Sequence, residues 1–294
     1  MVEHRGTSGF DNAAYMLAAA LFVSALILSA SVYFSVGGLS SVVEAKDFKV
    51  AVQGGTQAAA APTPTPVVAA PKPTPTPAPA PPQVQKADKP KAQAYIMSFC
   101  PYGLQMLKAY VPVMELLGDK ADLQVGFVPY AMHGKNEVDG NNYIYCVQKD
   151  SKAKLPAYLR CFVENGDYKG CLATAGVDTA KTESCVSSLD SQFNITGLFN
   201  DQTTWLSGRY PQYPVQQAEA EQFGVQGSPT FVLNGQQVPV SRSAEAIKQA
   251  VCAGFKTAPA ECARTLSTNQ EAPSTGKIGV GATAGAAAAA GGCG

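Results

Sequence analysis

Hydrophobic positions divide the chain into regions with different patterns. The first region is an uninterrupted run at residues 13–36 without a charged side chain, which follows a short segment at residues 1–12. As a helix this run would be roughly 36 Å long, enough to cross a hydrocarbon core about 30 Å thick. The hydrophobic part of a signal peptide is shorter, at about 7–15 residues, so we favour an uncleaved transmembrane helix over a cleaved signal sequence.

Residues 37–90 show no hydrophobic periodicity and are rich in alanine, proline and threonine. Thr-Pro and Ala-Pro steps repeat through residues 62–82. A segment of this composition cannot bury a core and adopts extended, semi-rigid conformations. We therefore expect a juxtamembrane stretch and a linker that holds the following domain away from the membrane.

The third region, residues 91–263, switches between the periods of strands and helices, which predicts an α/β fold. Apolar and alternating runs predict strands, and helical spacing predicts a helix between them, at 92–99, 104–117 and 123–127. A strand–helix–strand unit forms a parallel pair with a right-handed crossover. The carboxyl ends of both strands then meet at one edge, where the ligands of such sheets bind. Cys100 and His133 follow the two strands at that edge.

Residues 136–226 are predicted to form a helical insertion, after which the chain returns to the sheet. Short amphipathic patterns predict helices at 141–148, 155–164, 179–187 and 215–223. Asn234-Gly235, between two potential strands, is a strong signal for a two-residue hairpin, and Ser243 can cap a last helix. The remaining sequence, residues 264–294, is dominated by small and polar residues, so we expect a disordered Gly/Ala-rich tail.

Charge and cysteine content narrow the function. The chain has 22 basic and 22 acidic residues and no basic block, which argues against a nucleic-acid partner. All eight cysteines follow the predicted membrane span. Disulfides persist in oxidising compartments, so we expect a single-pass membrane protein whose cysteine-bearing domain is extracytoplasmic.

Cys100 is the candidate catalytic residue. It ends an apolar run and precedes Pro101, which suits the first position of a helix because its missing N–H is not needed there. At the start of a helix, free backbone N–H groups and the macrodipole favour a negative charge. This position should lower the pKa of the thiol and raise its reactivity, whereas the alternative is a buried, inert cysteine.

A second stretch supports this interpretation. Gly227-Ser228-Pro229-Thr230 leads into an apolar run, and a proline just before a strand in a tight turn is where a cis peptide can occur. Together, this stretch and Cys100-Pro101-Tyr102 before a helix make the chain resemble the thioredoxin superfamily, in its DsbA- and GILT-like branch. More narrowly, the chain resembles membrane-anchored archaeal thioredoxin-like proteins that read Cys-Pro-Tyr-Gly.

The resemblance covers roughly residues 90–263. It implies a four-stranded mixed sheet with a disulfide-stapled helical insertion that shapes the substrate groove. It also implies that Pro229 is cis and faces the thiol, and that substrate is bound by Pro101, Tyr102, Ser228, Pro229 and Thr230. It implies no cofactor.

One position departs from the pattern of the family. Typical members have Cys-x-x-Cys, and the fourth position here is Gly103. A mixed disulfide then has no resolving thiol on the next helical turn, since exchange needs a second attacking thiolate. We therefore expect Cys100 to act as a single active-site cysteine in reductase- or isomerase-like exchange that relies on an external thiol or redox partner.

The other cysteines are expected to be structural, apart from one. Wide spacing and the absence of an accompanying histidine argue against zinc for Cys146, Cys161, Cys171 and Cys185. Two disulfides are expected there, and of three connectivities we weakly prefer Cys161–Cys171 with Cys146–Cys185. Cys252 and Cys262 suit a disulfide between a helix and its exit loop, and this pair also resembles the ending of the family. No metal site is predicted.

Two residues have open roles. Cys293 is left over with Cys100, so it is either a resolving thiol, a protecting cap or, as we prefer, an incidental thiol. His133 either transfers protons near the thiol or, as we prefer, is a loop histidine without a role.

The expected function is membrane-anchored, extracytoplasmic thiol–disulfide exchange on the thiols and disulfides of proteins. One alternative is a redox-inactive thioredoxin-fold module that binds peptides, which the absence of a thiol at Gly103 would favour. A second alternative is a glutaredoxin-like monothiol enzyme, since Cys-Pro-Tyr occurs in that branch as well.

Overall fold

The computed structural model describes residues 84–281 and 292–294. The predicted membrane helix at residues 13–36 and nearly all of the linker lie outside these residues. Within the described part, no helix combines the length and the apolar character that a membrane span requires.

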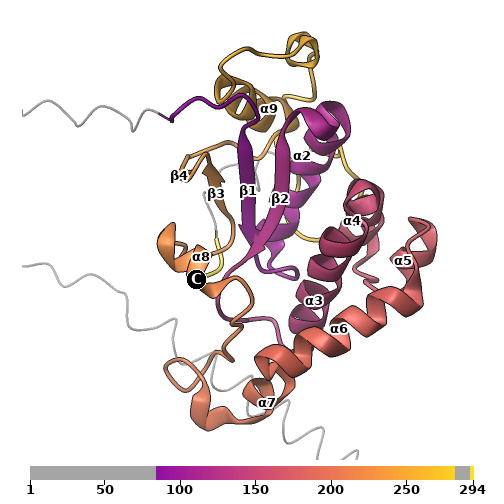
Figure 1. The fold of residues 1–294 in the computed structure, drawn as a ribbon, viewed down its shortest axis with the longest axis vertical. Coiled ribbons are helices and arrows are strands. Elements are labelled where there is room, and N and C mark those ends of the chain that lie inside the picture. Colours follow the sequence, from indigo (N-terminus) through magenta and orange to yellow (C-terminus); the bar gives the residue numbers. More distant parts are fainter. Residues whose placement is uncertain (1–83, 282–291) are drawn as a thin grey trace, which may run out of the picture. The chain divides into compact units, whose positions relative to one another are not determined.

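A four-stranded sheet in the order β2-β1-β3-β4 forms the centre of the described domain (Figure 1). β1 (Lys91–Ile96) pairs in parallel with β2 (Asp122–Phe127), and α2 (Pro101–Leu117) connects them. β3 (Thr230–Leu233) pairs antiparallel with β1 on its other side, and β4 (Gln236–Gln237) pairs antiparallel with β3. This mixed sheet is the one that the thioredoxin resemblance implied.

The hairpin between β3 and β4 shows how local sequence sets the topology. Asn234 and Gly235 have φ angles of 48° and 82°. A type I′ turn needs positive φ at both central residues, and Asn-Gly meets this requirement at little steric cost. The returning strand β4 is shorter than the expected stretch at residues 236–240, and the stretch adds one more hydrogen bond to β3, from Val238 N–H to Phe231 O at 2.9 Å.

The two faces of β1 contribute to different hydrophobic clusters. Ala92, Ala94 and Ile96 point into the main core, which includes residues of α2 and of α9 (Ala244–Ala253). Tyr95, together with Met97 just after the strand, points to the opposite face, where Ala220 of α8 (Gln217–Gln222) covers it. Because side chains alternate along a strand, one strand supports both clusters, and Cys100 belongs to the cluster of Tyr95 and Met97.

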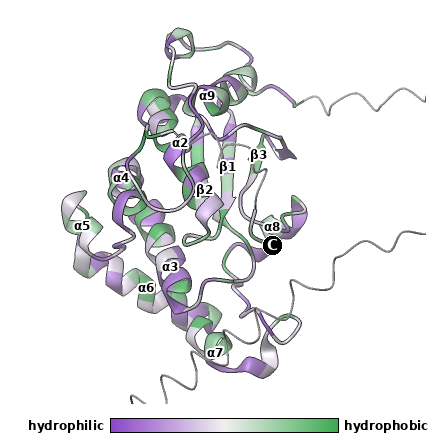
Figure 2. Ribbon diagram, turned by 180° about the vertical axis from the view of Figure 1, so that it is seen from behind, coloured by the Kyte–Doolittle hydropathy of each residue, from purple (hydrophilic) through white to green (hydrophobic). Residues whose placement is uncertain are grey.

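The helical insertion is built from α3 to α7 and is held by two disulfides. Cys146–Cys185 joins α3 to α6, and Cys161–Cys171 joins α4 to α5, which is the connectivity that the sequence weakly favoured. Hydrophobic and hydrophilic residues alternate along α3 and α4 (Figure 2), as expected for helices with one face on a core. The helices are α3 (Lys135–Asp150), α4 (Leu155–Asn165), α5 (Gly170–Thr174), α6 (Thr179–Phe193) and α7 (Ile195–Asn200).

The insertion contains more helix than the sequence predicted. Helices of five and six residues, α5 and α7, are too short to show a periodic pattern. α3 also begins before the expected residue 141, in a polar stretch. Its Glu137 side chain accepts from Met132 N–H, which lies outside the helix. Single 3₁₀ turns complete the domain at Gly118–Lys120, Lys152–Lys154, Gln202–Thr204 and Ala260–Ala263.

The structure corrects the expectation of a disordered tail from residue 264 onward. Residues 264–281, which we call the strap, run back over the domain. The strap's Ser274 N–H donates to Pro101 O at 2.9 Å, and its Gly276 N–H donates to Val163 O at 2.9 Å. Glu271 is buried, and its carbonyl accepts from the Gln105 side chain. Backbone hydrogen bonds are available to any residue type, so composition alone does not reveal this packing.

Removing the strap is expected to destabilise the domain by about 2 kcal/mol or more. Leu266 and Ile278 pack against the main core, and burial of apolar side chains contributes about 25 cal/mol per Å². The comparison is between a chain ending at residue 263 and one ending at residue 281, since neither contains Cys293. Equal denaturation midpoints for the two chains would contradict the structural role of the strap.

Candidate active site

Cys100 lies where β1 gives way to α2. It is the N-cap of this 17-residue helix, with an extended backbone (φ −65°, ψ 125°), and Pro101 occupies the first helical turn. Its Sγ accepts a hydrogen bond from Gly103 N–H at 3.4 Å. A sulfur at this position therefore accepts from an N–H that has no partner inside the helix, at the positive end of the helix dipole. Both features favour a thiolate.

The Ser228-Pro229 stretch lies directly across from this sulfur. The peptide bond between the two residues is cis, and Ser228 O is 3.6 Å from Cys100 Sγ. Ser228 Oγ accepts from Met97 N–H at 2.9 Å, which fixes the stretch to the end of β1. Residues that lie more than a hundred positions apart in the sequence therefore meet, as the resemblance implied.

Cys293 occupies the remaining side of the site, bonded to Cys100 in a disulfide with an S–S distance of 2.04 Å. Its backbone forms an antiparallel bridge with Ser228: Ser228 N–H donates to Cys293 O at 2.7 Å, and Cys293 N–H donates to Ser228 O at 2.8 Å. The preferred interpretation of Cys293 as an incidental thiol is therefore wrong. All eight cysteines lie in described residues, and each is in a disulfide; Cys252–Cys262 is the fourth pair.

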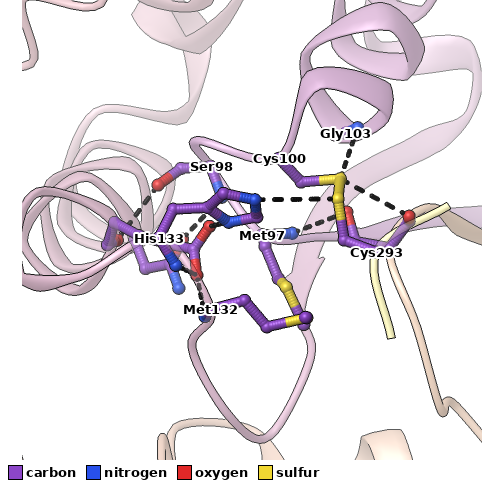
Figure 3. A network of polar contacts seen from close by, with 10 residues as sticks. Met97, Ser98, Cys100, Gly103, Met132, His133 and Cys293 are labelled. Carbon is purple, nitrogen blue, oxygen red and sulfur yellow. Dashed lines mark hydrogen bonds and ion pairs between the residues drawn. A yellow bond between two sulfur atoms is a disulfide. The ribbon is translucent and has the colours of Figure 1, made fainter. Parts of the chain in front are cut away.

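His133 points toward this disulfide from the loop after β2 (Figure 3). Its Nε2 is 3.8 Å from Cys293 Sγ, and its Nδ1 is 2.5 Å from Glu137 Oε2. His133 therefore lies between a carboxylate and the sulfur, while the choice between a role in proton transfer and no role stays a prediction. Chain order alone did not define its orientation.

Glu137 is the residue of the site that the sequence analysis missed. Its side chain is fully buried, and Oε1 accepts from Met132 N–H at 2.7 Å and from His133 N–H at 3.2 Å. The same residue's carbonyl accepts from Ser98 Oγ, which ties the start of α3 to the loop before Cys100. A glutamate four residues after a histidine, at the start of a helix, was the available signal.

The other predicted substrate-binding residues are near the sulfur but have contacts of their own. Tyr102 is covered by the Arg242 guanidinium, whose carbon is 5.3 Å from the ring centroid. Pro101 O accepts from the strap, and Thr230 Oγ1 donates to Gly227 O at 2.8 Å. Ser228 is thus the predicted residue whose backbone meets an extended segment directly.

Gly103 has no room for a side chain. A Cβ at this position would lie 2.6 Å from Met97 O and 2.7 Å from Ser228 Oγ. Both distances are below those that real Cβ atoms adopt, and one partner is a backbone atom. The position at which a Cys-x-x-Cys motif would place its second thiol is therefore closed in this protein.

Several solved structures are similar to this chain at low sequence identity. No protein-family model matches it, and no curated protein is similar in sequence. Reduced DsbA of Mycobacterium tuberculosis is similar at 15% identity, over 60% of this chain and 93% of that one, with a TM-score of 0.40. Reduced DsbG of the same organism is similar at 14% identity, over 60% and 88%, with a TM-score of 0.41. Pseudomonas aeruginosa DsbA follows at 19% identity, over 57% and 83%, with a TM-score of 0.33.

Proposed function

We propose that this chain is a thiol–disulfide oxidoreductase that acts on protein cysteines, in a reductase- or isomerase-like direction, with Cys100 as the thiol that meets substrate. One observation carries the proposal. An extended segment is held beside the sulfur through its backbone, at Ser228, while its cysteine is bonded to Cys100. A mixed disulfide with a substrate protein requires the same two features.

The geometry suits substrates of many sequences. Ser228 contributes one N–H and one C=O to the bound segment, and every residue other than proline can pair with these groups. In the first step the Cys100 thiolate attacks one sulfur of a substrate disulfide. The Cys100–substrate bond forms, the substrate disulfide breaks, and the electron pair leaves on the other substrate sulfur as a thiolate.

The cellular setting is part of the proposal. Three disulfides lie away from the site, which supports an oxidising, extracytoplasmic location. The charge-free run at residues 13–36 supports a single membrane anchor, with the linker holding the domain near membrane-bound or secreted substrates. An external thiol would supply electrons for repeated reduction.

The test is the reactivity of Cys100 in the reduced full-length chain. Alkylation of its peptide, followed by mass spectrometry across a pH series, is expected to reach its midpoint well below the free-thiol pKa of about 8.5. Addition of a disulfide-bonded peptide is expected to give a mixed disulfide at Cys100. A midpoint near 8.5 with no mixed disulfide would instead indicate a peptide-binding module without turnover.

A further inference from the structure

We propose that Cys293 is the resolving thiol of Cys100, and that His133, oriented by Glu137, accepts and returns the proton of Cys293. The inference rests on the proposed function and identifies Cys293 as the cysteine that forms a redox pair with Cys100. The two cysteines are 193 positions apart in the sequence, in place of the two intervening residues of a Cys-x-x-Cys motif.

Cys293 is the cysteine that can serve Cys100 within this chain. The position on the next turn of α2 is Gly103, where a side chain has no space. The other six cysteines are in disulfides with each other, within the insertion or between α9 and the turn that follows it. Cys293 already has the bond to Cys100 that resolution would produce.

The backbone of the Cys293 segment (residues 292–294) uses the groups that a substrate would use. Its bridge to Ser228 consists of two hydrogen bonds of 2.7 and 2.8 Å. Substrate and segment therefore exclude each other, and binding of an extended substrate requires the segment to leave. When the substrate chain withdraws from Ser228, the same hydrogen bonds guide Cys293 back to the mixed disulfide.

The tether that returns Cys293 is short because the strap is anchored. Gly281 pairs with Glu271, whose carboxylate also accepts from Gly279 N–H at 2.9 Å. Only residues 282–291 connect this anchored end to the Cys293 segment. Short tethers give effective concentrations in the millimolar range, which makes an intramolecular thiol competitive with external thiols.

The Glu137–His133 pair is directed at Cys293. A carboxylate oxygen beside Nδ1 favours the tautomer that carries its proton on Nδ1. In that tautomer the lone pair of Nε2 faces Cys293 Sγ and can accept its proton. The carboxylate is buried and held by two backbone N–H groups, which keeps the ring in place. The Cys100 thiolate is instead stabilised by Gly103 N–H and by the N-terminus of α2. Each of the two sulfurs therefore has a different group beside it.

The resolving step conserves atoms and electrons. Cys293 gives its proton to His133 Nε2, and its thiolate attacks Cys100 Sγ of the mixed disulfide. The Cys100–Cys293 bond forms, the Cys100–substrate bond breaks, and the leaving substrate thiolate takes up a proton. Over both steps the substrate disulfide is reduced to two thiols and the cysteine pair is oxidised, after which an external dithiol reduces the pair again.

The test follows one turnover of the reduced full-length chain with a peptide that holds a single disulfide. In Cys293→Ser, the mixed disulfide at Cys100 is expected to accumulate to one equivalent, and release of the second substrate thiol is expected to slow at least about 100-fold. The double variant C252S/C262S removes a disulfide away from the site and should release both thiols as the native chain does.

The outcomes separate the two proposals. If no mixed disulfide forms in either the native chain or Cys293→Ser, the proposed function fails. If Cys293→Ser forms it and releases both thiols at the native rate, the function stands and the resolving role is overturned. Faster turnover in Cys293→Ser would also overturn that role, because Cys293 would then act as a protecting cap.

The role of His133 is tested by separating the two steps. His133→Gln is expected to leave the rate of attack by Cys100 unchanged and to slow resolution by Cys293 roughly 100-fold, the usual size of a general-base contribution. Glu137→Gln is expected to slow the same step. Equal slowing of both steps would indicate that the two residues only support the fold of the site, and no slowing would remove the pair from the mechanism.

Discussion

Cys100→Ser is expected to abolish the reduction of a protein disulfide, lowering turnover by about 1000-fold or more. A serine hydroxyl at neutral pH is not ionised and does not attack a disulfide sulfur, so neither the first step nor the mixed disulfide can occur. The measurement is turnover of insulin or of a scrambled disulfide protein, with an external dithiol as reductant, for the native full-length chain and the variant.

Two controls make this loss specific to the sulfur. In Cys100→Ser the partner Cys293 has no disulfide bond, so it should react with a maleimide, whereas the other six cysteines should not. The unfolding midpoint should match that of Cys293→Ser, since both variants lack the same disulfide. Retention of more than about a tenth of native turnover would contradict the assignment, because another cysteine would then be doing the chemistry.

The part of the site formed by local motifs could be predicted from the sequence. A strand that ends at Cys100, with a proline opening the next helix, determines the position of the sulfur through N-capping. The hairpin after Pro229 determines where the facing stretch enters the sheet, because Asn234-Gly235 fits one type of turn. Both signals lie within a few residues of the feature that they predict.

The rest of the site depends on contacts that leave little trace in the sequence. Cys293 and the strap are held by backbone hydrogen bonds, which a sequence rich in small residues does not reveal. The pairing of His133 with Glu137 depends on how α3 begins, in a polar turn without apolar periodicity. Composition therefore predicted a disordered tail where the structure has a packed strap and a site cysteine.

Gly103 shows most clearly how the prediction from the sequence differs from the site in the structure. From the sequence, the missing thiol suggested that the chain cannot complete a dithiol cycle by itself. The structure gives a spatial reason for the glycine, since Met97 O and Ser228 Oγ occupy the space that a side chain would need. The second cysteine is present, but it comes from a segment 193 positions away in the sequence.

Gly103→Cys is therefore expected to damage the protein and not to create a Cys-x-x-Cys site. The new Cβ would lie 2.6 Å from Met97 O and 2.7 Å from Ser228 Oγ, and rotation of the side chain does not move a Cβ. Overpacking of a core costs about 1–3 kcal/mol and occasionally more, and a backbone neighbour places this site at the upper end. We expect a loss of about 3 kcal/mol in unfolding free energy, measured by chemical denaturation, together with loss of turnover.

Three further variants distinguish the steric effect of a Cβ at position 103 from the effect of a thiol. Gly103→Ala adds the same Cβ without a thiol and should lose nearly as much stability, whereas Gly281→Ala, where a Cβ meets its nearest neighbour at 3.5 Å, should be close to neutral. The double variant G103A/S228A removes one of the two close neighbours, so its loss should be smaller than the sum of the single losses. A stable Gly103→Cys protein in which the introduced thiol forms a disulfide with Cys100 would contradict the spatial argument, and the chain would then have no structural need for Cys293.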